Sequence, residues 1–196
     1  MSGADELLFF WGGVEMRHLI QITCFICFTL VFINVSFAQE ETGKQAEEQT
    51  GVVMLSEEWG KQACEVWNND PVLSEGLFES GWAENFRDDM DFRVIEIYRK
   101  DCPDSPHVQL KFQPKDNKAI CVDSGPDFTK GYDFLMWAST ENWVKMGEGK
   151  IGPMGGMATG RLRFKGSMWE AMKNMGPFKN FLLLFGKIPA DISKCN

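Results

Sequence analysis

The chain has 196 residues and a formal net charge of −8 at neutral pH. This length allows one domain with a single hydrophobic core. The negative charge argues against a nucleic-acid partner, because phosphates repel an acidic protein, and against electrostatic attachment to an anionic membrane. We therefore expect a soluble domain that does not bind nucleic acid.

The N-terminal part predicts export. Arg17 and His18 are followed by an apolar run from Ile22 to Ile33 and by the small residues Ser36 and Ala38. This order of basic, apolar and small residues is typical of a secretory signal peptide. The run is shorter than the ~20 residues that a membrane-spanning helix needs. We therefore expect cleavage after Ala38 and a periplasmic or secreted protein, rather than an uncleaved anchor.

Three segments of the chain are predicted. Residues 1–15 are acidic, which does not suit the start of a signal peptide. We therefore expect translation to begin at Met16 and residues 1–38 to be an upstream extension plus signal peptide. Residues 39–51 are polar and predict a flexible linker, and residues 52–196 form the domain. Cleavage leaves 158 residues and, by removing one arginine and three acids, a net charge of −6.

Six cysteines become four after cleavage. An even number in an exported domain is compatible with two disulfides, although four reduced thiols are the alternative. The spacing leaves all three connectivities open. No Cys-x-x-Cys motif occurs outside the signal segment, so we expect neither a zinc ribbon nor a thioredoxin-type site. The four cysteines are Cys64, Cys102, Cys121 and Cys195.

Two helices are predicted at the start of the domain. Ser56 has the character of an N-cap and is followed by acids and by apolar residues at helical spacing as far as Asn68. Asp70 and Pro71 are typical of an N-cap followed by a first-turn proline. They predict a second, shorter helix that runs towards Phe78.

Strand-like segments follow, in which apolar residues alternate or β-branched and aromatic residues are frequent. Pro114 to Asn117 has the composition of a turn, so the segments on either side of it are expected to form a hairpin. Thr140 is expected to cap a helix after the last of these segments. The predicted strands cover residues 92–98, 107–112, 119–122 and 132–137.

The last part of the domain predicts an edge strand and a closing helix. Arg161 to Lys165 alternates strictly, with its apolar residues facing inward. Ser167 and Glu170 have the spacing of a capping box, and Gly176-Pro177 interrupts the helix that they open. The order of helices, antiparallel strands, a crossing helix, an edge strand and a closing helix predicts an α+β fold.

The stretch from Lys150 to Met168, KIGPMGGMATGRLRFKGSM, resembles the sterol carrier protein (type two) sterol-binding domain family. There, a helix ends in Gly-Lys-Leu/Ile and a proline-containing apolar turn follows. The next motif is Gly-Lys/Arg-Leu-Lys/Arg-hydrophobic-x-Gly-Asp/Asn/Ser-Met. These elements occur here in order and without a gap. Residues 132–149 resemble the preceding strand and helix, so the resemblance covers residues 132–186 and is topological over 55–130.

The resemblance implies a five-stranded, mostly antiparallel sheet covered on one face by helices, with an apolar tunnel between them. A lipid, fatty acid or sterol would be the hydrophobic ligand, and membrane contact would be transient. The export signal departs from the peroxisomal members of the family, as does a C-terminus without the Ser-Lys-Leu address. We expect no cofactor and no metal.

Methionine is frequent among the aromatic residues of the last third of the chain. It is unbranched and adaptable, so it suits a wall that accepts flexible chains, although ordinary core packing is the alternative for any one residue. Gly176-Pro177 is expected to let a lid over the tunnel flex. The predicted tunnel wall comprises Phe134, Trp137, Trp143, Met146, Met154, Met157, Phe164, Met168, Met172, Met175, Phe178, Phe181, Leu182 and Phe185.

Catalytic residues are not expected. His107 is the one histidine left after cleavage, and we predict a solvated side chain at a strand end. Asp88 to Asp91 lacks the spacing of a calcium loop, and Gly152 to Gly156 lacks the Lys-Ser/Thr of a phosphate loop. The sequence thus predicts a non-catalytic lipid-binding and transfer domain. The alternatives are an interaction or dimerisation module with a filled tunnel, and an accessory domain that presents lipid to a separate enzyme; the oligomeric state is left open.

Overall fold

A computed structural model describes residues 51–87, 90–105, 107–126 and 129–195. The predicted extension, signal peptide and linker lie outside the described residues, apart from Gly51, and so does half of the acidic run that starts at Asp88. The described residues belong to one structural unit, Glu48–Asn196. No helix in this part of the chain is long and apolar enough to cross a membrane.

The first two helices begin where their capping residues predict. Helix α2 spans Glu57–Asn68, and the Ser56 hydroxyl accepts a hydrogen bond of 3.1 Å from the Trp59 N–H. Helix α3 spans Pro71–Glu79, and the Asp70 carboxylate accepts from its first free backbone N–H groups. Both sequence predictions are confirmed in type and position.

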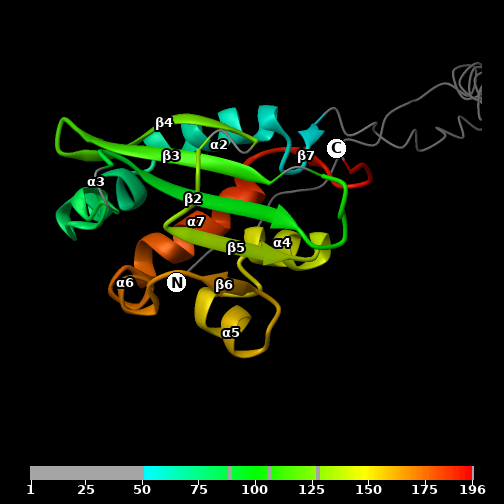
Figure 1. Ribbon diagram of the computed structural model, residues 1–196. Helices are drawn as coiled ribbons and strands as arrows, with labels where there is room; N and C mark the ends of the chain where they lie inside the picture. The colour runs from blue at the N-terminus through cyan, green and yellow to red at the C-terminus, as the bar shows by residue number, and fades with distance from the viewer. Residues whose placement is uncertain (1–50, 88–89, 106, 127–128, 196) are drawn as a thin grey trace, which may run out of the picture. The chain divides into compact units, whose positions relative to one another are not determined.

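The sheet has five strands in the order β4-β3-β2-β5-β6. All neighbours are antiparallel except β2 and β5, which are parallel, so the predicted α+β fold with a mostly antiparallel sheet is confirmed. Figure 1 shows α2 and α7 on the side of the sheet away from the viewer. The strands are β2 (Arg93–Arg99), β3 (Val108–Lys115), β4 (Lys118–Pro126), β5 (Phe134–Ala138) and β6 (Arg163–Lys165).

The β3–β4 hairpin is tighter and longer than predicted. Asp116 and Asn117 form its two-residue turn, and both adopt left-handed φ angles, 51° and 58°. Such turns match the right-handed twist of the flanking strands, and Asp and Asn tolerate this conformation well. The ladder extends to Pro126, which lies beyond the predicted end of the second strand.

Two short helices connect β5 to β6. Helix α4 spans Thr140–Gly147, and its N-cap is Ser139 rather than the predicted Thr140, whose hydroxyl is bonded to Arg99 and Asp101. The glycine-rich segment after it forms helix α5, Pro153–Ala158, where the resemblance implied a turn. A proline in the first position of a helix loses no hydrogen bond, which is compatible with this short helix.

The closing helix is interrupted at Asn174 and not at Gly176-Pro177 as predicted. Helix α6 spans Met168–Lys173 and helix α7 spans Met175–Lys187, so Pro177 lies in the first turn of α7, where its missing N–H has no partner to lose. Asn174 has non-helical angles and its side chain donates to the Glu170 carbonyl, 2.9 Å away.

Two disulfides are formed, so the domain has one of the three connectivities that the sequence left open. Cys64–Cys121 joins α2 to β4, and Cys102–Cys195 joins the loop after β2 to the C-terminal segment. That segment includes strand β7 (Ala190–Asp191), which pairs in parallel with β1 (Val52–Val53). The two ends of the domain are therefore held together.

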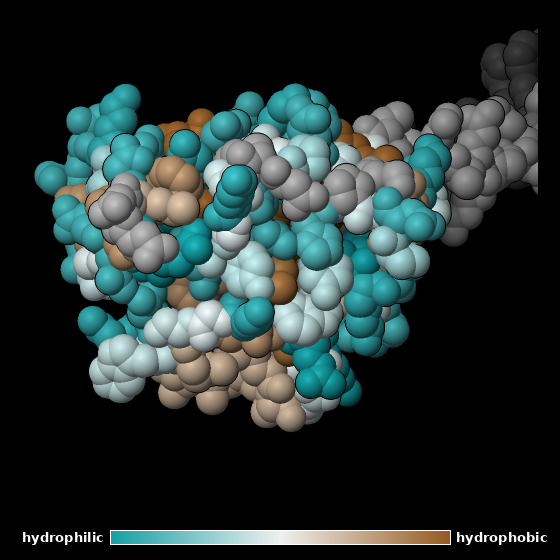
Figure 2. All heavy atoms as spheres, viewed as in Figure 1, coloured by the Kyte–Doolittle hydropathy of each residue, from teal (hydrophilic) through white to brown (hydrophobic). Residues whose placement is uncertain are grey.

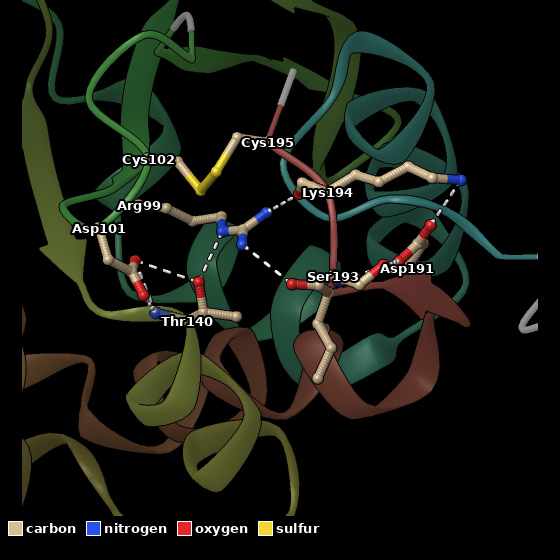
Figure 3. The surroundings of a disulfide bond; sticks show 9 residues. Arg99, Asp101, Cys102, Thr140, Asp191, Ser193, Lys194 and Cys195 are labelled. Atoms are coloured by element: carbon tan, nitrogen blue, oxygen red, sulfur yellow. Dashed lines mark hydrogen bonds and ion pairs between the residues drawn. A yellow bond between two sulfur atoms is a disulfide. The ribbon is translucent and has the colours of Figure 1, made fainter.

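Arg99 fixes the C-terminal segment from below the second disulfide (Figure 3). Its guanidinium is buried and donates to the carbonyls of Lys194 and Ile192, at 2.7 and 3.2 Å, and to the Thr140 hydroxyl at 2.7 Å. A buried arginine is stable only when its donors are satisfied. The last residues are thus held by a charged network as well as by the disulfide.

Helices α4 and α7 are in backbone contact where two glycines face each other. A Cβ atom at Gly147 would overlap the backbone of Gly186, and a Cβ at Gly186 would overlap that of Gly147. Glycine is needed here for close approach rather than for an unusual φ angle. The contact fixes the C-terminal half of α7 against α4.

Candidate functional site

An apolar cavity of about 50 Å³ lies between the sheet and helices α6 and α7. Its walls come from eight helices and strands spread along the sequence, and six of the thirteen lining residues are aromatic. The apolar lining consists of Trp67, Leu77, Trp82, Ile95, Phe134, Met136, Phe164, Ala171, Pro177, Phe178 and Phe181, and the polar lining of Glu170 and Asn174.

The strands contribute to this cavity from one face of the sheet. Ile95 is opposite Phe134 in the β2–β5 ladder, and Met136 is opposite Phe164 in the β5–β6 ladder. Side chains alternate between the two faces along a strand, so residues two apart and their cross-strand partners share a face. This face is the one that α6 and α7 cover.

Aromatic rings fix the walls by contacting one another. The Trp67 and Phe112 ring centroids are 4.2 Å apart, and Phe164 lies 5.5 Å from Phe134 and 5.8 Å from Phe178. Tilted pairs at these distances contribute stability beyond burial alone. The sheet and α7 therefore form a continuous aromatic wall.

One end of the cavity is polar. The Arg93 guanidinium, whose side chain is 4% exposed, lies over the rings of Trp82 and Phe134 at 4.7 and 5.3 Å. It donates to the Trp82 carbonyl and to Glu170 Oε2, both at 2.9 Å, and its Nε lies 3.3 Å from Asp133 Oδ1. A buried charge needs such partners.

Glu170 brings helix α6 to this cluster. Its second carboxylate oxygen accepts from the Asn85 side chain, and its backbone N–H is capped by Ser167 at 3.3 Å. The predicted capping box is therefore half formed, because the Glu170 side chain turns to Arg93 instead of back to the N-cap. This carboxylate connects α6 to the sheet.

An open groove of about 460 Å³ adjoins the polar end. It shares Trp82, Glu170 and Asn174 with the cavity, and Lys173 and Trp169 form its outer rim. The apolar cavity and the polar groove are thus contiguous. Such an arrangement suits a ligand with an apolar body and a polar end.

Eight of the predicted tunnel residues lie inside the domain but divide into two groups. Phe134, Phe164, Phe178 and Phe181 line the cavity. The other four belong to the core on the far side of α7, where Trp143 stacks on Phe185 with centroids 4.2 Å apart. This second group consists of Trp143, Met146, Leu182 and Phe185, all buried.

The structure places Trp137 on the opposite face of the sheet from the cavity. It alternates with Phe134 and Met136 along β5, and its ring stacks on Tyr98 at 5.8 Å. The apolar run gave no period that separates the two faces, which is why the sequence assigned Trp137 to the tunnel.

The methionines also lie elsewhere than predicted. Met154, Met168 and Met172 are 51%, 49% and 49% exposed, and Figure 2 shows hydrophobic atoms on the surface over α5. Helix α6 turns Ala171 inward, so the residues at its other positions face solvent. Met157 and Met175 are partly buried against the core without lining the cavity.

His107 lies directly before β3, as predicted, and its side chain is 38% exposed, but its ring also makes contacts within the domain. Its Nδ1 lies 2.6 Å from Glu96 Oε1, and its ring stacks on Tyr98 at 4.0 Å. In the described part of the chain, no three His, Cys, Asp or Glu residues converge as a metal site would require.

Several residues of the cavity escaped the sequence analysis. Trp67 and Ile95 fall in a predicted helix and a predicted strand, but no sequence signal indicates that α2 and β2 contact the closing helix. Asp133, which interrupts an apolar strand, was the one signal of a buried charged cluster, since such a carboxylate needs a cationic partner. Its partner Arg93 comes from a strand that is distant in sequence.

Comparison with known proteins assigns the family. The fold is an α+β domain with an apolar cavity between the sheet and helices α6 and α7. The model of the SCP-2 sterol transfer family matches residues 77–179, more than half of the chain. The protein therefore belongs to this family of lipid-binding and transfer domains, as the sequence resemblance implied. No curated protein matches the chain.

Solved structures of similar fold share little sequence with this chain. A crystal structure of sterol carrier protein 2 is 13% identical, covers 69% of this chain and 98% of its own, and has a TM-score of 0.48. A conserved hypothetical protein from Thermus thermophilus is 14% identical over 73% and 94%, with a TM-score of 0.47. A sterol carrier protein domain of Helicoverpa armigera is 18% identical over 64% and 86%, with a TM-score of 0.41.

Proposed function

We propose that this protein is an exported, non-catalytic carrier that binds a lipid, fatty acid or sterol between the sheet and helix α6. The observation that carries the proposal is the aromatic cavity under α6 and α7, which has one polar end and opens beside a polar groove. The family assignment supports the class of ligand.

The cavity must enlarge to accept such a ligand. Pockets that enclose small molecules usually measure about 300–1,000 Å³, whereas this one measures about 50 Å³. The conformation described is therefore closed, and one wall has to move. The alternative is an interaction module whose tunnel is filled, so the experiment below is designed to separate the two.

Helix α6 is the wall best suited to move. It has six residues and turns Ala171 into the core. Gly166, with a φ of 144°, precedes it and the non-helical Asn174 follows it, so the backbone is not helical at either end. Displacing α6 requires the Glu170 carboxylate to leave Arg93 and Asn85. We call residues 166–174 the gate.

Burial of a ligand can offset this displacement. A sixteen-carbon chain gains on the order of 12 kcal/mol from transfer out of water, before ordering costs. A hydrogen bond to a charged group contributes only about 1.5–3 kcal/mol. A closed gate is thus compatible with lipid binding.

Export and the absence of catalysis are part of this proposal. Two cysteine pairs at disulfide distance are compatible with an oxidising compartment outside the cytosol. His107 is engaged with Glu96 and lies on the sheet face that does not line the cavity. It is therefore not placed to act on a ligand in the cavity.

The experiment is native mass spectrometry combined with organic extraction of the purified protein. We expect one lipid molecule per chain. The variant Ala171→Leu should fill the cavity and reduce lipid content severalfold, because its added methyl groups occupy the space that the ligand needs. Ala158→Leu, at an exposed position of α5, is the matched control and should retain the lipid.

Lipid content that is equal in the two variants would contradict the proposed site. An empty wild-type chain that is dimeric in solution would favour the interaction module instead. A lipid-loaded chain that co-purifies with an enzyme would favour the accessory role.

A further inference from the structure

Apolar side chains are exposed where helices α5 and α6 flank the edge strand β6. Trp169 is 75% exposed, and Met154, Met168 and Met172 are each about half exposed. In Figure 1, α5 lies below β6 and α6 lies to the left of it, and Figure 2 shows tan atoms along this edge of the domain. Contiguous exposed apolar groups of this kind mark interaction surfaces.

Helix α6 carries its larger apolar side chains on the face that points away from the core, whereas a core helix carries them on the face that points inward. Met168 and Met172 are one turn apart, as are Trp169 and Lys173, so these four form its outward face. Ala171, on the inward side, lines the cavity. The larger apolar residues of α6 therefore face water, which packing alone does not explain.

Positive charge surrounds this apolar surface, although the chain as a whole carries −8. Between Pro153 and Lys179 the sequence has five basic residues and one acid, Glu170, whose carboxylate is bound by Arg93. Four exposed basic residues lie on β6, next to it and on α6. They are Arg161, Arg163, Lys165 and Lys173.

These four cations are not neutralised by neighbouring carboxylates. Within the described ranges, none of them has an ion pair. Glu141, the acid near Arg161, is paired with Lys145. Glu84 is exposed and lines the same groove as Lys173, and no ion pair joins the two in the described residues. The local charge is therefore positive.

We propose that this surface docks on an anionic lipid bilayer. We call it the docking face, and it comprises Met154, Met168, Trp169 and Met172 with Arg161, Arg163, Lys165 and Lys173. Tryptophan is enriched at the membrane interface, and exposed apolar groups enter the headgroup region while Lys and Arg attract anionic lipid. The net charge of −8 does not reveal this positive surface, because it sums the charges of the whole chain.

Two elements of the docking face also line the cavity. Phe164 from β6 and Ala171 from α6 line the cavity, so the same two elements present the docking face outward. A membrane that contacts α6 would lie next to the gate. This inference rests on the proposed function only in that a carrier must meet a membrane to exchange its lipid.

The test compares full-length variants on vesicles of phosphatidylcholine with and without phosphatidylglycerol. Residues 1–50 are then present equally in every sample. Each Lys or Arg near an anionic surface contributes about fivefold in partitioning, so Lys165→Gln with Lys173→Gln should weaken binding by about 25-fold. The matched control, Lys100→Gln with Lys115→Gln, makes the same charge change at exposed positions outside the docking face.

Trp169 provides a readout specific to this site. Four of the other tryptophans are at most 5% exposed, namely Trp59, Trp67, Trp82 and Trp143. Brominated phosphatidylglycerol should therefore quench a signal that Trp169→Phe removes, and high salt should abolish the quenching.

Three results would overturn the docking face: equal binding to both vesicle types, an equal loss in both double variants, or no quenching of Trp169. Binding of an acidic protein in place of vesicles would overturn it too and would assign the surface to a protein partner. The double variants should keep their bound lipid in solution. An empty wild-type chain would therefore refute the carrier function without affecting the vesicle result.

Discussion

At the β4 edge of the sheet, covalent and hydrogen bonds fix helix α2, whereas at the β6 edge helix α6 is held mainly by one carboxylate. Cys64 is bonded to Cys121, the Asn68 amide pairs with both backbone groups of Cys121, and the Trp67 indole donates to the Ala119 carbonyl at 2.8 Å. At the other edge, Glu170 contacts Arg93 and Asn85.

The difference between the two edges meets two requirements that a carrier places on its cavity. A cavity keeps its shape only if most of its walls are rigid, and it can be filled only if one wall moves. The lining residues that belong to α2, β2 and β5 lie in the fixed part, whereas Ala171 and Glu170 lie in the gate. Local stability is expected to differ accordingly between the two edges.

The largest effect should come from removing the bond at the fixed edge. Cys64→Ser with Cys121→Ser opens a loop with a sequence separation of 57 residues, and the chain-entropy model gives a loss of about 4 kcal/mol in the free energy of unfolding. Urea denaturation measures it. A reducing agent should affect the wild type but have a smaller effect on the variant, and an unchanged midpoint would show that this bond does not stabilise the fixed edge.

A smaller effect is expected at the gate. Glu170→Gln removes the charge that holds α6 to Arg93, which should lower the free energy of unfolding by about 1–2 kcal/mol and speed lipid release severalfold. Release is measured by transfer of a fluorescent fatty acid to acceptor vesicles. Glu141→Gln breaks an exposed pair with Lys145 and should change stability by less than about 0.5 kcal/mol. Slower release from Glu170→Gln would contradict the gate.

The smallest effect concerns the contact between α3 and α7. Burial raises the pKa of Asp70, but hydrogen bonds from Lys187 and Asn180 outweigh it and hold the pKa below its ordinary value. The carboxylate therefore stabilises the fold above the ordinary aspartate pKa of about 4, and this contribution is lost as the pH falls through the lower folded value.

Asp70→Asn keeps a good N-cap and removes only the charge. It should lower the free energy of unfolding by about 0.5–1 kcal/mol at pH 7, and this gap from the wild type should close in acid. Denaturation curves across this pH range test it. A gap that is constant with pH would mean that the Asp70 charge contributes nothing.

The sequence predicted the elements that depend on local signals. Ser56 and Asp70 cap helices because their side chains satisfy the first free N–H groups, and the motif around Gly160 predicted the family. The cavity walls depend on contacts between distant segments, and composition cannot supply these. Methionine frequency was therefore a poor guide: Met168 and Met172 are exposed, and the cavity lining has six aromatic residues but one methionine, Met136.

The glycine contact between α4 and α7 has a mechanical consequence. Because Gly147 and Gly186 meet without intervening side chains, the distance between the two helices at that point is set by their backbones. If this contact is kept, any tilt of α7 displaces the opposite end of the helix most, beside Asn174. A small rotation there would swing α6 outward while the C-terminal turn stays in place. A bulkier residue at either glycine would force α4 and α7 apart and change where they contact each other.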